Sequence, residues 1–126
     1  MVARKSQPSQ ASVVAYPAFD HYTYTDEGNA SRFLETYGKS LRYDHTSAKW
    51  YGWNKHWWAE LPDSAVYRTA SGMVHKLRAK ASDEGHIPFQ SWMHSTMSGG
   101  HIQEIIKRAR NFKPIAVESE DAWNKS

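Results

Sequence analysis

The sequence predicts a small α+β domain in which an antiparallel, aromatic-rich β-meander packs against about four short helices. Two patterns support this fold class. Apolar residues recur at three-to-four residue spacing in four separate segments, whereas residues 41–61 contain short aromatic runs separated by turn residues. The length of 126 residues suits one domain with a modest core.

The composition excludes several classes of protein. The chain has no Cys, which rules out a disulfide framework and a zinc ribbon. No apolar run approaches the roughly 18 residues that a membrane span needs, and the polar N-terminus lacks the apolar core of a signal peptide. We therefore expect a cytoplasmic protein that does not associate with membranes.

The first segment, residues 1–24, contains Ser, Gln, Ala and two Pro without any sustained period, and it is interpreted as a flexible leader. A helix is expected next, because Thr25 can accept an unpaired backbone N–H at its start. Phe33, Leu34 and Tyr37 continue it at helical spacing, and Gly38 supplies the stop. This helix opens a predicted domain over residues 25–114.

The meander is predicted from three runs, Leu41–Tyr43, Lys49–Trp53 and His56–Glu60, with a hairpin turn at Asn54-Lys55. Strand alternation places neighbouring residues on opposite faces of a sheet. Trp57 and Trp58 therefore cannot share a face, so one aromatic set can fill the core while the other faces solvent. Burial of most of these Trp side chains in the core is the favoured interpretation, because aromatics supply the largest buried area in a small domain.

Three further helices follow. The first runs from Asp63 or Ser64 to about Ala81; the second begins near Pro88 and carries Trp92; the third starts near Ile102, after a break at residues 98–100. Pro114 is expected to end the last helix, and residues 115–126 are interpreted as an acidic C-terminal tail. The first of the three carries an apolar stripe: Val66, Ala70, Met73, Val74, Leu77 and Ala81.

Several of these segments together resemble a known module. Residues 25–33, Tyr37-Gly38, Leu41-Arg42-Tyr43 and Trp50-Tyr51-Gly52-Trp53 are similar to the region just ahead of the superfamily-three helicase in phage, plasmid and poxvirus primase-helicases. The resemblance extends over roughly 25–124. It implies a domain that connects a primase to a helicase and takes part in template handling.

The chain departs from such primase-helicases where catalysis is concerned. It contains no Gly-x-x-x-x-Gly-Lys-Ser/Thr loop, so ATP hydrolysis is not expected. It also lacks the close acidic pair plus His that primase catalysis uses to hold metal ions. His94 and His101 lie on different predicted helices, and no further residue has the spacing of a metal ligand. Ser95 and His94 are neighbours in the sequence, which does not by itself indicate a catalytic triad. We expect no catalytic residue, no metal site and no cofactor.

The positive charge is concentrated in one region. The net charge is +3, yet residues 63–113 carry eight bases against four acids, while the acidic tail is negative. Nucleic-acid contact would then fall mainly on phosphates and depend steeply on salt. Solvated helix faces explain the basic residues equally well. The candidate nucleic-acid-binding residues are Arg42, Lys49, Trp53, Lys55 and Trp57 in the meander and Arg68, Lys76, Lys80, Lys107, Arg108 and Arg110 on the helices.

The leading hypothesis is a non-enzymatic, replication-associated domain of a phage or mobile element that binds single-stranded or template DNA, replication proteins, or both. The alternative is a small phage protein that inhibits a host nuclease or a CRISPR-type defence complex through protein–protein contact. A third interpretation is a linker domain excised from a longer chain, without activity of its own.

Overall fold

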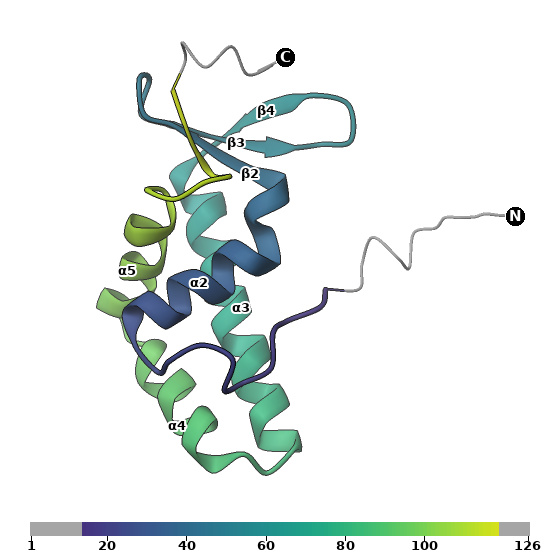
Figure 1. The fold of residues 1–126 in the computed structure, drawn as a ribbon, viewed down its shortest axis with the longest axis vertical. Helices are drawn as coiled ribbons and strands as arrows, with labels where there is room; N and C mark the ends of the chain where they lie inside the picture. Colours follow the sequence, from purple (N-terminus) through teal and green to yellow (C-terminus); the bar gives the residue numbers. More distant parts are fainter. Residues whose placement is uncertain (1–13, 119–126) are drawn as a thin grey trace, which may run out of the picture.

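The structure is a computed structural model that describes residues 14–118, with a sheet at one end and helices extending away from it (Figure 1). It confirms the α+β class. The elements in chain order are α2 (Asp26–Tyr37), the 3-10 turn η1 (Gly38–Ser40), β2 (Leu41–Asp44), β3 (Lys49–Trp53), β4 (Trp58–Leu61), α3 (Asp63–Asp83), α4 (Ile87–Thr96), α5 (Gly99–Ala109) and β5 (Ala116–Val117).

The sheet has the strand order β4-β3-β2-β5. Strands β2, β3 and β4 form the predicted antiparallel meander, with Tyr43 opposite Trp50 and Trp53 opposite Trp58. Strand β5 is parallel to β2, so the sheet is mixed rather than purely antiparallel. This strand lies within the segment interpreted as an acidic tail; two residues are too short for any strand period to be visible in the sequence.

The helices agree closely with the predicted segments. The Thr25 hydroxyl caps α2 by accepting the Gly28 N–H at 2.9 Å, and all six residues of the α3 stripe are buried. One boundary was wrong: α5 begins at Gly99, so residues 99 and 100 form its first turn instead of a break. A helix can include glycines at its start, where few intrahelical bonds depend on them.

The segment before α2 is joined to the core, although it was interpreted as part of a leader. Phe19 is buried and stacks on Phe89 of α4, with 4.5 Å between ring centroids. Gly28 allows the chain to approach α2, because a Cβ at this position would lie 1.8 Å from the carbonyl oxygen of Thr23. Residues 14–24 therefore pack as part of the domain, and residues 1–13 lie outside the described part of the chain.

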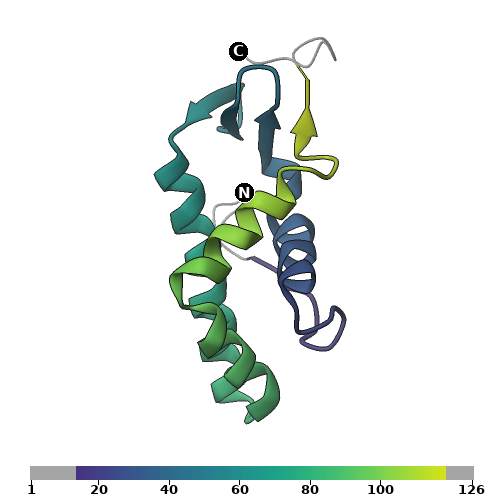
Figure 2. The same cartoon turned by 90° about the vertical axis from the view of Figure 1, so that its left-hand side faces the viewer.

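The two views show how the helices support the sheet. Helices α2, α3 and α5 run below it, and α4 packs against the far half of α3 (Figures 1 and 2). Trp50, which is 2% exposed, extends the core from the sheet toward these helices. Within residues 14–118, no helix is long and apolar enough to cross a membrane.

Candidate nucleic-acid interface

The β-strand register divides the meander into two faces. Trp50 and Tyr43 point toward the helices and are buried. The residues that alternate with them point away from the helices. Apart from Asp44, which is buried, we call this set the outer sheet face: Arg42, Lys49, Tyr51, Trp53, Trp58 and Glu60.

The loop between β3 and β4 exposes two tryptophans. It spans residues 54–57, so it is longer than the predicted two-residue turn. The Asn54 side-chain oxygen holds the loop by accepting the backbone N–H groups of His56 at 3.0 Å and Trp57 at 2.9 Å. Lys55 adopts a positive φ of 87°. Trp53 and Trp57 are each 47% exposed, so large aromatic surface faces solvent at this end of the hairpin.

Trp58 and Arg42 support the outer sheet face. The rings of Trp53 and Trp58 lie 5.4 Å apart, and the Arg42 guanidinium carbon lies 4.5 Å from the Trp58 ring centroid. Arg42 also donates to the carbonyls of Gly38 and Leu41, at 2.9 and 2.8 Å. Burial lowers the pKa of Arg42. Arg42 is thus engaged in holding Trp58 and the start of β2.

Four of the predicted basic residues already have acidic neighbours. Lys49 lies 3.6 Å from Glu60, and Lys80 lies 2.6 Å from Glu84. Lys107 and Arg108 share Glu104, at 4.0 and 2.9 Å. Within residues 14–118, the predicted bases without a carboxylate within 4.0 Å and without hydrogen bonds from their side chains are Lys55, Arg68, Lys76 and Arg110.

The predicted residues do not form one continuous surface. Trp53, Lys55 and Trp57 lie together at the hairpin end, whereas Lys76 and Lys80 lie farther along α3. Arg68 and Arg110, which are far apart in sequence, border the same cavity. The structure therefore brings together two groups: the hairpin end and this cavity.

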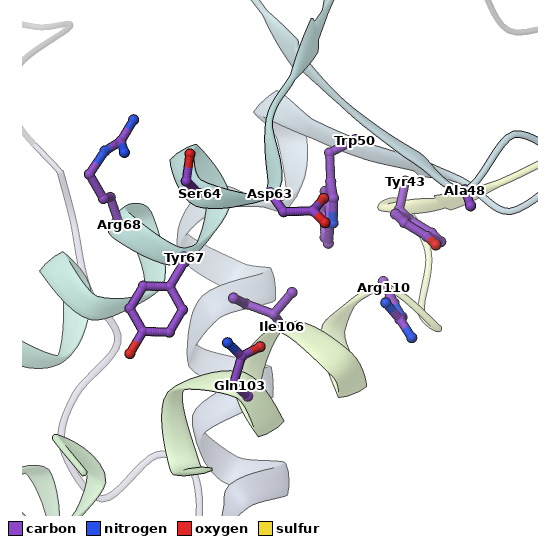
Figure 3. A pocket seen from close by; sticks show the side chains of 10 residues that line it. All are labelled: Tyr43, Ala48, Trp50, Asp63, Ser64, Tyr67, Arg68, Gln103, Ile106 and Arg110. Carbon is purple, nitrogen blue, oxygen red and sulfur yellow. The ribbon is translucent and has the colours of Figure 1, made fainter. Parts of the chain in front are cut away.

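The cavity has a volume of about 450 Å³ and lies between the inward side of the sheet, the start of α3 and the end of α5 (Figure 3). We call it the α3–α5 cavity. Sequence reasoning identified its two arginines and missed its other polar residues, because only the packing of α5 against α3 brings them together. The cavity is lined by Tyr43, Ala48, Trp50, Asp63, Ser64, Tyr67, Arg68, Gln103, Ile106 and Arg110.

The two histidines considered as metal ligands, His94 and His101, lie in different surroundings. His101 Nδ1 lies 2.7 Å from an Asp26 carboxylate oxygen, which links the starts of α5 and α2. His94 is exposed near the end of α4. Among the residues that the structure describes, no group of three or more His, Cys, Asp or Glu is arranged to hold a metal ion.

Comparison with protein-family models identifies a family for the chain. The family model described as D5 N terminal like matches residues 30–125 of the chain. Neither the curated proteins nor the solved structures contain a match. The family match covers every element of the domain from within α2 to β5.

Proposed function

The chain belongs to the D5 N-terminal-like family, the N-terminal domain of D5-like primase-helicases, and we propose that it is a non-enzymatic replication domain that binds single-stranded DNA on its outer sheet face and the adjoining loop of residues 54–57. The family links the chain to the replication primase-helicases of phages and mobile elements. Three points go beyond the family membership: single-stranded DNA as the ligand, the outer sheet face as its binding surface, and the absence of catalytic activity.

The hairpin end is the observation that carries this proposal. Trp53 and Trp57 expose about half of their surface, and Lys55 lies between them in the chain. Unpaired bases stack on exposed aromatic rings with about 1–3 kcal/mol per base, and a neighbouring cation attracts the phosphates. Trp58, held by Arg42, backs Trp53 and fixes the orientation of the stacking surface.

Single-stranded DNA fits this surface better than duplex DNA. Stacking on a side-chain ring requires a base whose face is accessible, and bases in a duplex are already stacked on their neighbours. The outer sheet face also carries the acidic Glu60, beside Lys49, and this weakens nonspecific attraction to a duplex. Aromatic contact, more than charge, therefore supplies the binding energy.

The ion pairs change the expected salt dependence. Each phosphate neutralised on a single strand contributes about 0.7 to the slope of log affinity against log salt. All nine predicted bases would give a slope of about −6, whereas the four bases without acidic or hydrogen-bonding partners in residues 14–118 limit its size to about 3. The steep dependence predicted from the sequence is thus replaced by a moderate one.

Fluorescence anisotropy with a short labelled oligonucleotide tests the proposal. Wild-type protein should bind single-stranded DNA at about 50 mM salt and prefer it to a duplex of the same sequence. Trp53→Ala and Trp57→Ala should each weaken binding at least about fivefold. Phe112→Ala is the matched control, since Phe112 is an aromatic side chain that is 54% exposed elsewhere, beyond α5. Absence of binding at low salt would contradict the proposal.

A further inference from the structure

Five polar side chains that line the α3–α5 cavity have no hydrogen-bond or ion-pair partner among residues 14–118, and four of them are exposed to solvent. Asp63, Ser64 and Arg68 come from the first turns of α3, and Gln103 and Arg110 come from α5 and the residue after it. Their side chains form no hydrogen bond or ion pair with any other residue in the part of the chain that the structure describes. Elsewhere on α5, Glu104 and Arg108 satisfy each other at 2.9 Å.

The charges are arranged along the opening. Figure 3 shows Arg68 and Arg110 at opposite ends, with the Asp63 carboxylate between them and directed toward Trp50. The Arg110 guanidinium carbon lies 5.2 Å from the Tyr43 ring centroid, which holds this cation at the sheet end of the cavity. A single small anion would meet one arginine and be repelled by Asp63, so the arrangement suits a longer ligand with two negative ends.

The walls and the size suit a nucleobase. The volume of about 450 Å³ lies within the range of roughly 300–1,000 Å³ that is typical of small-molecule sites. Trp50 and Ile106 supply apolar wall, while Asp63 and Gln103 supply polar groups of the kind that read base edges. A carboxylate accepts hydrogen bonds from an exocyclic amine, which cytosine has and thymine lacks.

We propose that the α3–α5 cavity holds one nucleotide of a bound single strand. Its base enters the cavity and donates an amine hydrogen bond to Asp63, and the phosphates on its two sides bind Arg68 and Arg110. The inference rests on the proposed function and adds a second site, on the other side of the sheet from the outer sheet face. It also gives the domain a preference for an amine-bearing base, which stacking alone does not provide.

Anisotropy titrations with oligo-dC and oligo-dT, which share backbone and ring size, test this site. Wild-type protein should bind oligo-dC roughly fivefold or more tightly than oligo-dT. Asp63→Ala should abolish this difference, and Gln103→Ala, a second variant on another helix, should reduce it. Arg68→Ala should weaken both oligonucleotides equally and reduce the salt slope by about 0.7. Lys39→Ala is the matched control, because Lys39 is an exposed base of η1 that neither lines the cavity nor belongs to the candidate nucleic-acid-binding residues.

The outcomes separate this site from the outer sheet face. If single-stranded DNA binds and Trp53→Ala weakens it, yet Asp63→Ala keeps the oligo-dC preference and Arg68→Ala behaves like Lys39→Ala, the cavity proposal is overturned while the proposed function stands. If only the cavity variants weaken binding, the outer sheet face is overturned instead. Competition by free dCMP as effective as that by oligo-dC would overturn the two-phosphate arrangement. Thermal melting of each variant confirms that it is folded.

Discussion

Replacement of Arg32 by Met should destabilise the domain strongly. Arg32 lies in α2, is 1% exposed, and has no carboxylate within 4.0 Å among residues 14–118. Its guanidinium instead donates to main-chain carbonyls of the preceding segment: Thr23 at 3.0 Å, Phe19 at 3.1 Å and Tyr22 at 2.6 Å. A further bond reaches the Asn29 side-chain oxygen at 2.8 Å.

The expected loss of stability in Arg32→Met can be estimated from these contacts. Methionine fills a similar volume but removes the guanidinium donor from three carbonyls, whereas Asn29 Oδ1 keeps the Trp92 indole N–H as a donor at 3.0 Å. Each hydrogen bond to a charged group contributes about 1.5–3 kcal/mol. The cost of burying the guanidinium, which also lowers the pKa of Arg32, offsets a large part of this sum. We expect a net loss of about 2–4 kcal/mol in the free energy of unfolding.

Urea unfolding followed by circular dichroism measures this loss, and each kcal/mol should lower Tm by about 4 °C for a domain of this size. Arg32→Lys is the informative comparison, because it keeps the positive charge but cannot present the same planar fork of donors. It should lose about half as much stability as the Met variant. An Arg32→Met protein that unfolds at the wild-type urea concentration would refute the view that Arg32 anchors residues 19–23 to α2.

Three further outcomes are expected. Trp50→Ala should cost about 3–5 kcal/mol in urea unfolding because it empties the core, whereas the exposed Trp53→Ala should change stability by less than about 1 kcal/mol. Lys55→Gly should raise stability by up to about 1 kcal/mol, measured as a higher urea midpoint, because glycine adopts the φ of 87° without strain. Burial, with a hydrogen bond to a carboxylate, raises the pKa of Tyr24 to about 12, against about 10 in an unfolded chain. The associated stability should be complete below pH 10 and lost as pH rises through 12, and Tyr24→Phe should flatten this decline in urea midpoints measured from pH 8 to 12.

Periodicity explains which parts of the fold could be predicted. The α3 stripe from Val66 to Ala81 repeats at helical spacing over several turns, so the pattern determines both the helix and its buried side. Strand alternation likewise separated Trp50 from its exposed neighbours, although the pattern alone did not show which face was covered. By contrast, β5 consists of two residues and is stabilised by pairing with β2, a strand far away in the sequence, with Ala116 opposite Tyr43. No local signal can reveal such a strand.

In the candidate site, too, local sequence patterns reveal some features, whereas others depend on contacts between distant residues. Burial of most meander tryptophans in the core was the favoured interpretation, and it was wrong: of Trp50, Trp53, Trp57 and Trp58, only Trp50 is buried. The aromatic pattern does not show which rings the helices cover, and the binding roles of Trp53 and Trp57 stay a prediction. The roles of the basic residues were not visible, since ion pairs such as Lys49 with Glu60 depend on strand register. Asp63 was predicted only as a possible helix cap; its position in the α3–α5 cavity results from helix packing.

The affinity of a Trp53→Ala/Trp57→Ala double variant for single-stranded DNA is the decisive measurement of base stacking at the hairpin end. Both rings are exposed, so the variant should remain folded, and the Phe112→Ala protein controls for the loss of an exposed aromatic side chain. We expect an affinity at least about 25-fold below wild type for the double variant and an unchanged affinity for the control. Equal affinities for wild type and the folded double variant would contradict binding on the outer sheet face.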